Sequence, residues 1–188
     1  MNFNQHSNLE GTHAIFSASK YHWLNYSDDK MLESLDNMRA AERGTRLHAF
    51  AAEAINLRRR QKGTDYFSSY VNDAIGFGMT PEVILYFNDW FYGQTDAIKF
   101  DEKKAFLRIH DLKNCESKTH MEQLMIYAAY FCLEYHIKPG DIQMELRIYQ
   151  QPNKYDPELR VFEPTASDIA PIMDKVIHTT KLIHEKDI

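Results

Sequence analysis

The stretch FYGQTDAIKFDEKKAFLRIHDLKNCESKTHMEQLMIY, residues 91–127, decides the fold. Residues 91–100 and 105–113 read as two strands, because each contains an apolar run bounded by polar or turn residues. A charged tip, residues 101–104, joins them. Residues 119–135 form the strongest helix pattern of the chain, apolar around much of the circumference. The stretch therefore predicts a β-hairpin followed by a helix that packs on the sheet.

The polar residues of this stretch are spaced so that their side chains can meet. Asp111 and Lys113 are two residues apart, so on a strand they point to the same side. Gln123 and Tyr127 are four residues apart, so on a helix they lie one turn apart on one face. With Asp96 on the preceding strand, two carboxylates, one lysine and a Gln/Tyr face can converge. Hard cations such as Mg²⁺ and Mn²⁺ prefer such carboxylate ligands, and the spacing therefore predicts a metal site.

The chemistry that suits this set is cleavage of a phosphodiester. A divalent cation neutralises charge at phosphorus and activates water near neutral pH, and a nearby lysine stabilises the developing negative charge. An isolated D-x-K also occurs by chance in exposed hairpins, where Asp and Lys are merely solvated. The presence of Asp96 and of the Q-x-x-x-Y helix favours the site over that alternative.

These motifs, in the order Gly-x-x-Asp, apolar strand, Asp-x-Lys and Gln-x-x-x-Tyr, resemble those of the PD-(D/E)xK nuclease superfamily, specifically its RecB-like, phage-type exonuclease branch. The resemblance implies a restriction-endonuclease-like core. It implies that Asp96 and Asp111 bind the metal together with the carbonyl of Leu112, and that Lys113 is the catalytic lysine. The residues that it assigns to catalysis are Asp96, Asp111, Lys113, Gln123 and Tyr127, the last two organising the site and touching DNA.

A second element lies earlier in the chain. The run Arg43-Gly44-Thr45-Arg46-Leu47-His48 resembles the R/E-G-T-x-x-H element of the same branch, which implies His48 as a further metal ligand. A lone histidine beside the apolar stripe of a helix is more often a core residue. An imidazole beside two carboxylates favours Mn²⁺ as well as Mg²⁺. Glu53 is five residues farther on and is expected at the surface.

The remaining periodicities predict the fold class. We expect an α+β protein, an α/β sandwich whose mixed central sheet contains an antiparallel three-strand meander flanked by helices. A single domain is expected over residues 1–188, with an N-terminal arm and short helix at 1–27 and the core at 28–188. The predicted elements are helices at 28–60, with a break at Gly44, and at 65–75, 119–135 and 168–184, and strands at 82–88, 91–100, 105–113, 141–150 and 159–162, with 141–150 parallel to a neighbour.

Composition narrows the class of protein. Two cysteines are too few for a disulfide framework or a four-thiolate iron–sulfur cluster. No apolar run approaches the length of a membrane span, so we expect no membrane partner and a cytoplasmic location, in a bacterium or a phage-infected host. The net charge of −5 is unusual for a DNA-binding protein, but DNA contact needs only a local basic patch.

We therefore expect a Mg²⁺- or Mn²⁺-dependent deoxyribonuclease, an exonuclease of phage-type recombination, replication or DNA processing. The alternative is a nuclease-fold protein that binds DNA or a partner protein without cutting, as an accessory or inhibitory factor. DNA is the expected partner; a recombination or replication protein and a homo-oligomer stay open. No G-x-x-x-x-G-K-[ST] loop is present, which argues against an intrinsic ATPase.

Overall fold

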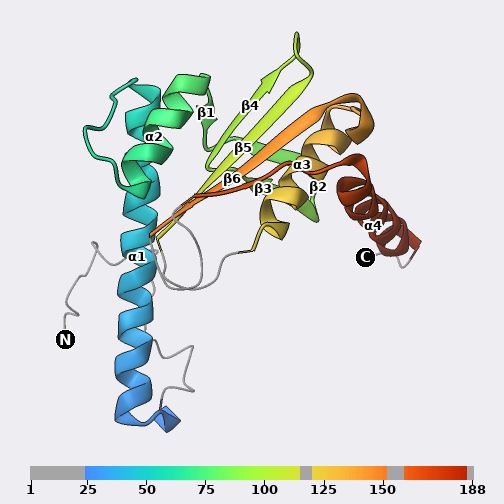
Figure 1. Ribbon diagram of the computed structural model, residues 1–188. Coiled ribbons are helices and arrows are strands. Elements are labelled where there is room, and N and C mark those ends of the chain that lie inside the picture. The colour runs from blue at the N-terminus through green and yellow to red at the C-terminus, as the bar shows by residue number, and fades with distance from the viewer. Residues whose placement is uncertain (1–23, 115–119, 152–158, 186–188) are drawn as a thin grey trace, which may run out of the picture. The chain divides into compact units, whose positions relative to one another are not determined.

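The computed structural model describes residues 24–114, 120–151 and 159–185 (Figure 1). Its first long element is α1 (Asp28–Asn56), and the contacts of the chain group into two compact units, Met1–Arg46 and Leu47–Ile188, whose boundary falls inside this helix. The expectation of a single domain over 1–188 stays a prediction. The second unit contains the sheet and every residue of the candidate site.

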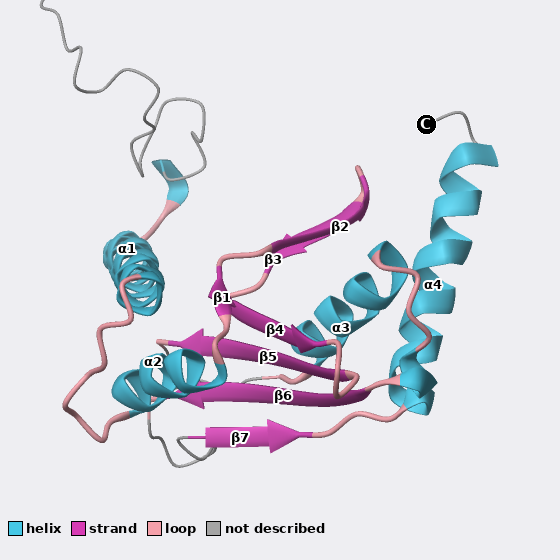
Figure 2. Cartoon of the chain, turned by 90° about the horizontal axis from the view of Figure 1, so that it is seen from above, coloured by secondary structure: helices cyan, strands magenta, loops and turns pink. Residues whose placement is uncertain are grey.

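The second unit is built on a mixed five-stranded sheet in the order β1-β4-β5-β6-β7 (Figure 2). The two central strands, β5 (Phe106–Lys113) and β6 (Gln143–Gln150), are parallel, and their neighbours run antiparallel to them. The parallel pair needs a crossover, which α3 (Glu122–Glu134) and a short 3₁₀ turn (Pro139–Asp141) provide. The edge strands are β1 (Thr80–Pro81) and β7 (Leu159–Phe162), and β4 (Ala97–Asp101) lies between β1 and β5.

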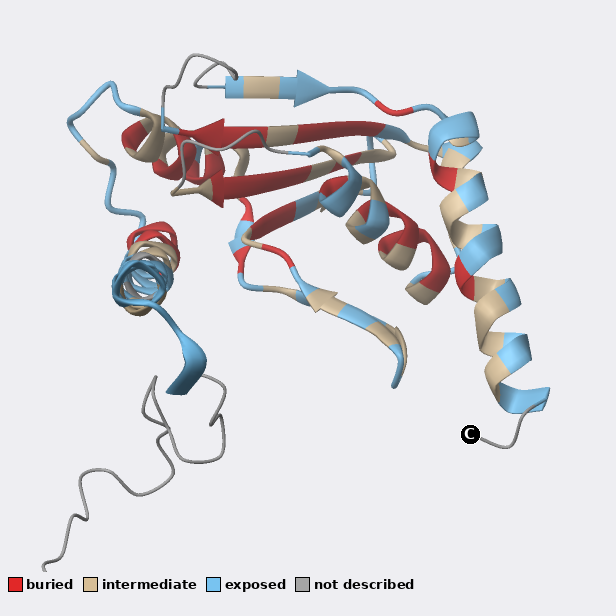
Figure 3. Cartoon of the chain, turned by 90° about the horizontal axis from the view of Figure 1, so that it is seen from below, coloured by how far each residue is buried: buried red, intermediate tan, exposed pale blue. Residues whose placement is uncertain are grey.

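Helices cover both faces of the sheet, because alternate residues of the central strands enter two separate cores. Leu107 and Ile109 of β5 pack with α3 and with α4 (Ala166–Glu185). Leu112 of β5 packs on the opposite face with α2 (Tyr66–Phe77) and with the last turns of α1. Both central strands are buried over most of their length (Figure 3). Side chains at the ends of these strands are therefore held by packing on two sides.

The helix ends use the capping chemistry that their sequences favour. The carboxylate of Asp65 accepts hydrogen bonds from the backbone N–H and the hydroxyl of Ser68, at 3.0 and 2.8 Å, and so begins α2. Gly78 ends this helix in the left-handed conformation, with φ 66°. Asp168 accepts from the N–H and hydroxyl of Thr165 at the start of α4. These caps set where α2 and α4 meet the sheet.

The predicted antiparallel meander is present, and its strand pairs share one register, but a bend interrupts it. Thr80 pairs with Ile98, and Ile84 of β2 (Ile84–Asn88) pairs with Gln94 of β3 (Phe91–Gln94), so one register runs through both pairs. Between them the ladder is broken at Glu82, whose φ is 55°, and at Asp96 opposite it. The strand predicted at 91–100 therefore divides into β3 and β4, and β2–β3 forms a separate two-stranded sheet.

The other predictions of the fold can be compared directly. The α+β class, with a mixed sheet flanked by helices, is confirmed. The predicted break at Gly44 is wrong, because α1 continues through it; a glycine weakens a helix but keeps its backbone hydrogen bonds. The N-terminal arm and most of the short helix predicted within 1–27 lie outside the described residues. No helix in the described ranges is both long and apolar enough to cross a lipid bilayer.

Candidate metal and nucleic-acid site

The predicted site residues gather where β4 begins and β5 ends. Ala97 of β4 is paired with His110 of β5, so continuing this antiparallel register places Asp96 opposite Asp111. The bend that separates β3 from β4 lies at Asp96 itself. Two acidic residues from adjoining strands thus share one end of the sheet, as the spacing predicts.

Asp96 is held by two contacts, one on each carboxylate oxygen. Its Oδ2 accepts the backbone N–H of Leu112 at 2.7 Å, and its Oδ1 lies 3.1 Å from Nδ1 of His48. The hydrogen bond with Asp96 raises the pKa of His48 above its ordinary value, against the opposing effect of burial. The α1 histidine and the β5 backbone therefore fix the direction in which this carboxylate points.

Asp111 is the most deeply buried carboxylate of the group, with 2% of its surface exposed. Its Oδ1 pairs with Nζ of Lys113 at 3.0 Å. Its Oδ2 is buried and has no hydrogen-bond partner among the described residues. Burial, and then the charge of Asp96, raise the pKa of Asp111 to about 6. A buried carboxylate oxygen without a partner is costly, and such a group in a native structure calls for an explanation.

Lys113 joins the acidic pair to α3 through a chain of hydrogen bonds. Its Nζ donates to Oε1 of Gln123 at 2.8 Å, in addition to its contact with Asp111. The Nε2 of Gln123 in turn donates to the hydroxyl of Tyr127 at 3.2 Å. The ammonium group is thus oriented from both sides, and the predicted Gln/Tyr helix face does meet the predicted D-x-K strand.

Gly93 determines where Tyr127 can lie, although the sequence motifs did not single out this glycine for its packing. A Cβ on Gly93 of β3 would stand 2.8 Å from Cε1 of Tyr127, closer than real Cβ contacts allow. Only glycine therefore lets the ring lie against the β3 backbone. An isolated glycine in a strand pattern is the sequence signal that could have revealed this close approach.

Tyr70 lies near the acidic pair but was not predicted, and Glu53 plays no visible part in the site. Tyr70 of α2 is fully buried, and burial followed by the charges of Asp96 and Asp111 raises its pKa well above the ordinary value. An aromatic residue in a helix looks like any core residue, so no sequence signal marks it. Glu53 is exposed, as expected for a surface residue.

The donors are of the kind that binds hard divalent cations. Asp96 and Asp111 offer carboxylate oxygens, one of them the Oδ2 of Asp111, to which none of the described residues is hydrogen-bonded, and His48 offers an imidazole. The residues present therefore fit Mg²⁺ or Mn²⁺. No group of three or more His, Cys, Asp or Glu side chains within the described ranges is already arranged as a metal cluster. The ligand roles of His48, Asp96, Asp111 and the Leu112 carbonyl stay predictions.

Comparison with known proteins assigns this arrangement of residues to no family. The chain matches no protein-family model, and a search among curated proteins finds no match. Membership of the PD-(D/E)xK superfamily therefore stays a prediction, which rests on the motifs and on the contacts among the residues that carry them.

Proposed function

We propose that the protein is a divalent-cation-dependent deoxyribonuclease that hydrolyses phosphodiester bonds of DNA. The observation that carries the proposal is the Oδ2 of Asp111, a buried carboxylate oxygen that has no partner within the described part of the chain. It lies beside a second acidic residue and a fixed lysine. A purely structural carboxylate would be stabilised by having both oxygens hydrogen-bonded. A carboxylate that must bind a cation gains from leaving one oxygen available.

The proposed cation site consists of Asp96 and Asp111, with His48 and the carbonyl of Leu112 as further ligands. When bound, Mg²⁺ or Mn²⁺ supplies positive charge against the phosphate oxygens and makes water acidic enough to act as the nucleophile near neutral pH. The affinity for the cation also depends on protonation, because the pKa of Asp111 is about 6 and only its ionised form is a ligand.

Lys113 is the proposed electrostatic catalyst. Its ammonium group is held 3.0 Å from Asp111 Oδ1 and 2.8 Å from Gln123 Oε1, so it cannot swing freely. A fixed positive charge at the edge of the acidic pair stabilises negative charge that develops on the phosphate without reorganising during the reaction. Gln123, oriented by its bond to Tyr127, is a positioning residue for this lysine.

The test is cleavage of labelled linear DNA, single- and double-stranded, with Mg²⁺ or Mn²⁺ and with chelator. We expect cleavage by the wild type only with the cation, and a loss of at least about a hundredfold for Asp111→Asn or Lys113→Ala. The hairpin tip offers a matched control pair, because Lys104 of the turn lies 3.7 Å from Asp101, the last residue of β4, far along the hairpin from the acidic pair. Asp101→Asn and Lys104→Ala should cleave like the wild type.

Two results would contradict the proposal. The first is full activity of Asp111→Asn or Lys113→Ala with either cation. The second is wild-type protein that binds DNA but never cuts it, which is the outcome expected of a non-cleaving accessory protein.

A further inference from the structure

The loop between α1 and α2, residues 57–65, has the densest positive charge of the chain (Figure 1). Its residues 58–62 read Arg-Arg-Arg-Gln-Lys, and no stretch of five residues outside the loop contains more than two lysines or arginines. All four of these cations are exposed, and the candidate site uses none of them. Because the whole chain has a net charge of −5, contact with DNA depends on a local basic patch.

The first of these cations, Arg58, holds the loop against α2. Its backbone has φ 55°, in the left-handed region where glycine is usual, and its N–H donates to the carbonyl of Ile55 at 3.1 Å as α1 ends. Its Nη1 donates to the carbonyl of Ile75, near the end of α2, at 3.3 Å. A cation suits this end of a helix, where the dipole is negative. Arg58 therefore has a structural role.

The rest of the loop is fixed by Gln61. Its backbone N–H donates to Oδ1 of Asn72 at 2.9 Å, and Nδ2 of Asn72 donates back to the carbonyl of Gln61 at 2.9 Å. The Nε2 of Gln61 also donates to the carbonyl of Arg59 at 3.0 Å. The loop thus presents Arg59, Arg60 and Lys62, which we call the loop cations, on an ordered backbone. A site that is ordered in advance loses less entropy when it binds.

The charge of the loop cations is not offset by neighbouring acids. No acidic side chain of the described residues pairs with them. The last turn of α1, the loop and α2 contain three acids, which are Glu53, Asp65 and Asp73. Asp65 caps α2, and Asp73 is already paired with Arg147 at 3.1 Å. The loop therefore has a surplus of positive charge.

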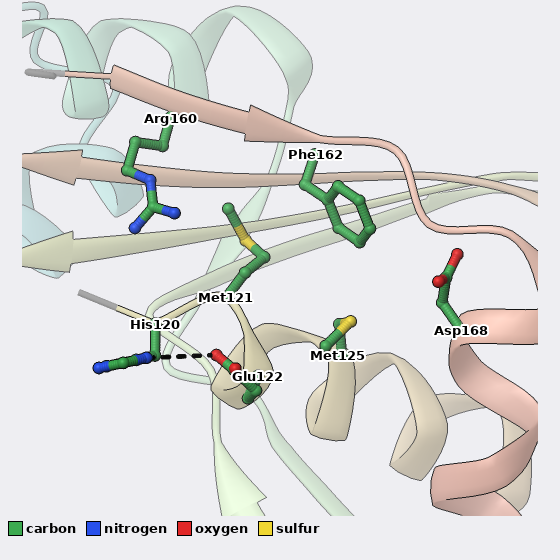
Figure 4. Close-up of a pocket in the computed structure, with 7 residues that line it drawn as sticks. All are labelled: His120, Met121, Glu122, Met125, Arg160, Phe162 and Asp168. Atoms are coloured by element: carbon green, nitrogen blue, oxygen red, sulfur yellow. Dashed lines mark ion pairs between the residues drawn. The ribbon is translucent and has the colours of Figure 1, made fainter. Parts of the chain in front are cut away.

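The pocket between β7 and the starts of α3 and α4 lacks such a surplus. Glu122 and Asp168 line this pocket together with Arg160 (Figure 4). Arg160 also has an interaction of its own. An anion would meet two carboxylates there, so the loop is the better place for a chain of phosphates.

The loop lies within reach of DNA that is bound at the acidic pair. His48, whose Nδ1 lies 3.1 Å from Asp96, precedes the last residue of α1, Asn56, along the same helix. At about 1.5 Å per residue, this part of α1 is about 12 Å long. Successive phosphates of one strand in a duplex are about 3.4 Å apart along the axis. Phosphates about four nucleotides from the acidic pair can therefore reach the loop.

We propose that the loop cations bind the phosphate backbone of DNA about four nucleotides from the phosphate held at Asp96 and Asp111. The inference rests on the proposed function and adds to its substrate class, which is DNA long enough to reach both places. Contacts to phosphates set the position of DNA on a protein and read no sequence, so this contact holds DNA of any sequence.

The test measures DNA binding by the full chain in the Lys113→Ala background with Mg²⁺, by fluorescence anisotropy over a salt titration. The probes are a labelled duplex longer than one helical turn and its single strand. The loop variant replaces the three loop cations, by Arg59→Gln, Arg60→Gln and Lys62→Gln. The control variant removes the same charge from exposed positions of the β4–β5 hairpin, by Lys99→Gln, Lys103→Gln and Lys104→Gln.

The loop variant should bind DNA with a weaker dependence on salt. The slope of log Kd against log salt should fall by at least about 0.9 on the duplex or 0.7 on the single strand, the values for one phosphate contact. The control variant should keep the slope of the background protein. Because both variants change the net charge equally, this comparison separates a contact from long-range attraction.

Neutral methylphosphonate linkages, placed one at a time along the DNA, should locate the contact. Cleavage by the wild type identifies the linkage at the acidic pair. In the background protein, neutralising a linkage about four nucleotides from it should weaken binding. In the loop variant the same substitution should have no further effect, whereas neutralising the linkage at the acidic pair should still weaken binding.

The failures of the two proposals can be told apart. If the wild type cleaves DNA with a cation but the loop variant binds every probe like the control variant, the loop is no DNA site and the nuclease proposal stands. If the loop variant loses affinity only for vesicles containing phosphatidylserine, the loop binds membranes and the inference fails. If the loop contributes to DNA binding but the wild type never cuts, only the nuclease proposal fails.

Far-ultraviolet circular dichroism must show that each variant is folded. If the triple loop variant is unfolded, Arg59→Gln and Lys62→Gln take its place as single substitutions, with Lys103→Gln as their control. A salt slope that stays unchanged in both would overturn the inference.

Discussion

At the scale of single residues, the buried carboxylate of Asp111 lowers the stability of the folded protein and is also the group on which the proposed function depends. Its carboxylate is buried beside a second acidic residue, and its pKa is raised to about 6. An acid whose pKa is raised by folding keeps its proton in the folded state at pH values where the unfolded state has released it. It therefore destabilises the fold progressively above its ordinary pKa, and fully once the pH exceeds the raised pKa. Lys113 offsets this effect only in part, because burial and Asp96 are the larger causes.

Replacing Asp111 by Asn should therefore stabilise the protein in chelator. The stability of Asp111→Asn relative to the wild type should grow as the pH rises from about 4 to above 6 and then stay constant, reaching about 3 kcal/mol. Urea unfolding at several pH values measures this difference. A difference that does not change with pH, or a less stable variant at pH 8, would show that the folded protein tolerates the charged carboxylate.

At the scale of elements, the site depends on how closely β3 and α3 approach each other. Gly93 allows the Tyr127 ring to lie against β3, and Tyr127 orients Gln123 and through it Lys113. The sequence predicted both elements and the meeting of Gln123 with Lys113. The isolated glycine of the strand pattern signals that something approaches the β3 backbone. It does not say that Tyr127 is the partner, because contact between a ring and a backbone depends on the angle between helix and sheet, and this angle is set by the whole core.

Gly93→Ala should accordingly impair cleavage more than folding. The new methyl group must displace Tyr127, so kcat should fall about tenfold or more, as happens when a catalytic group is slightly misplaced. Gly140→Ala is the matched control, because its Cβ would meet Ala166 at an ordinary 3.8 Å. If Gly93→Ala retains the wild-type kcat while Tyr127→Phe does not, kcat depends on the hydroxyl of Tyr127 and not on the position of its ring.

The cap of α2 gives a prediction that is independent of the site. Asp65→Ala should cost about 1 kcal/mol at pH 7, because two hydrogen bonds to Ser68 are lost. Those bonds hold the pKa of Asp65 below its ordinary value, so the stabilisation is present above that value and is lost as the pH falls through the folded pKa. Thermal unfolding of the variant and the wild type should converge as the pH falls below the folded pKa of Asp65. Asp65→Asn, which can still accept a bond, should lose less stability at pH 7.

At the scale of the whole molecule, local patterns predicted the class, most elements and the parallel crossover correctly. They failed at two places. At Gly44 the helix continues although a glycine favours a break, and beside Asp96 the backbone bends although the apolar pattern continues. The bend has no signal in the apolar pattern, since one register runs through it. The candidate site was predictable because its residues occur in motifs with fixed spacing.

Binding of the cation should be visible in the stability of the intact protein. Mg²⁺ or Mn²⁺ at a hundred times its dissociation constant should raise the free energy of unfolding by about 2.7 kcal/mol. The gain should vanish in Asp111→Asn and persist in the hairpin-tip variant Asp101→Asn. Differential scanning calorimetry over a cation titration makes the measurement. An equal rise in Tm for both variants would place the bound cation elsewhere.

The buried carboxylate of Asp111 also has a consequence for directed evolution. A library screened for heat resistance alone should accumulate neutral residues at position 111, whereas one screened for the ability to degrade DNA should keep the acid. Enrichment at this codon under the two selections would reveal how much thermal robustness the proposed nuclease activity costs the protein.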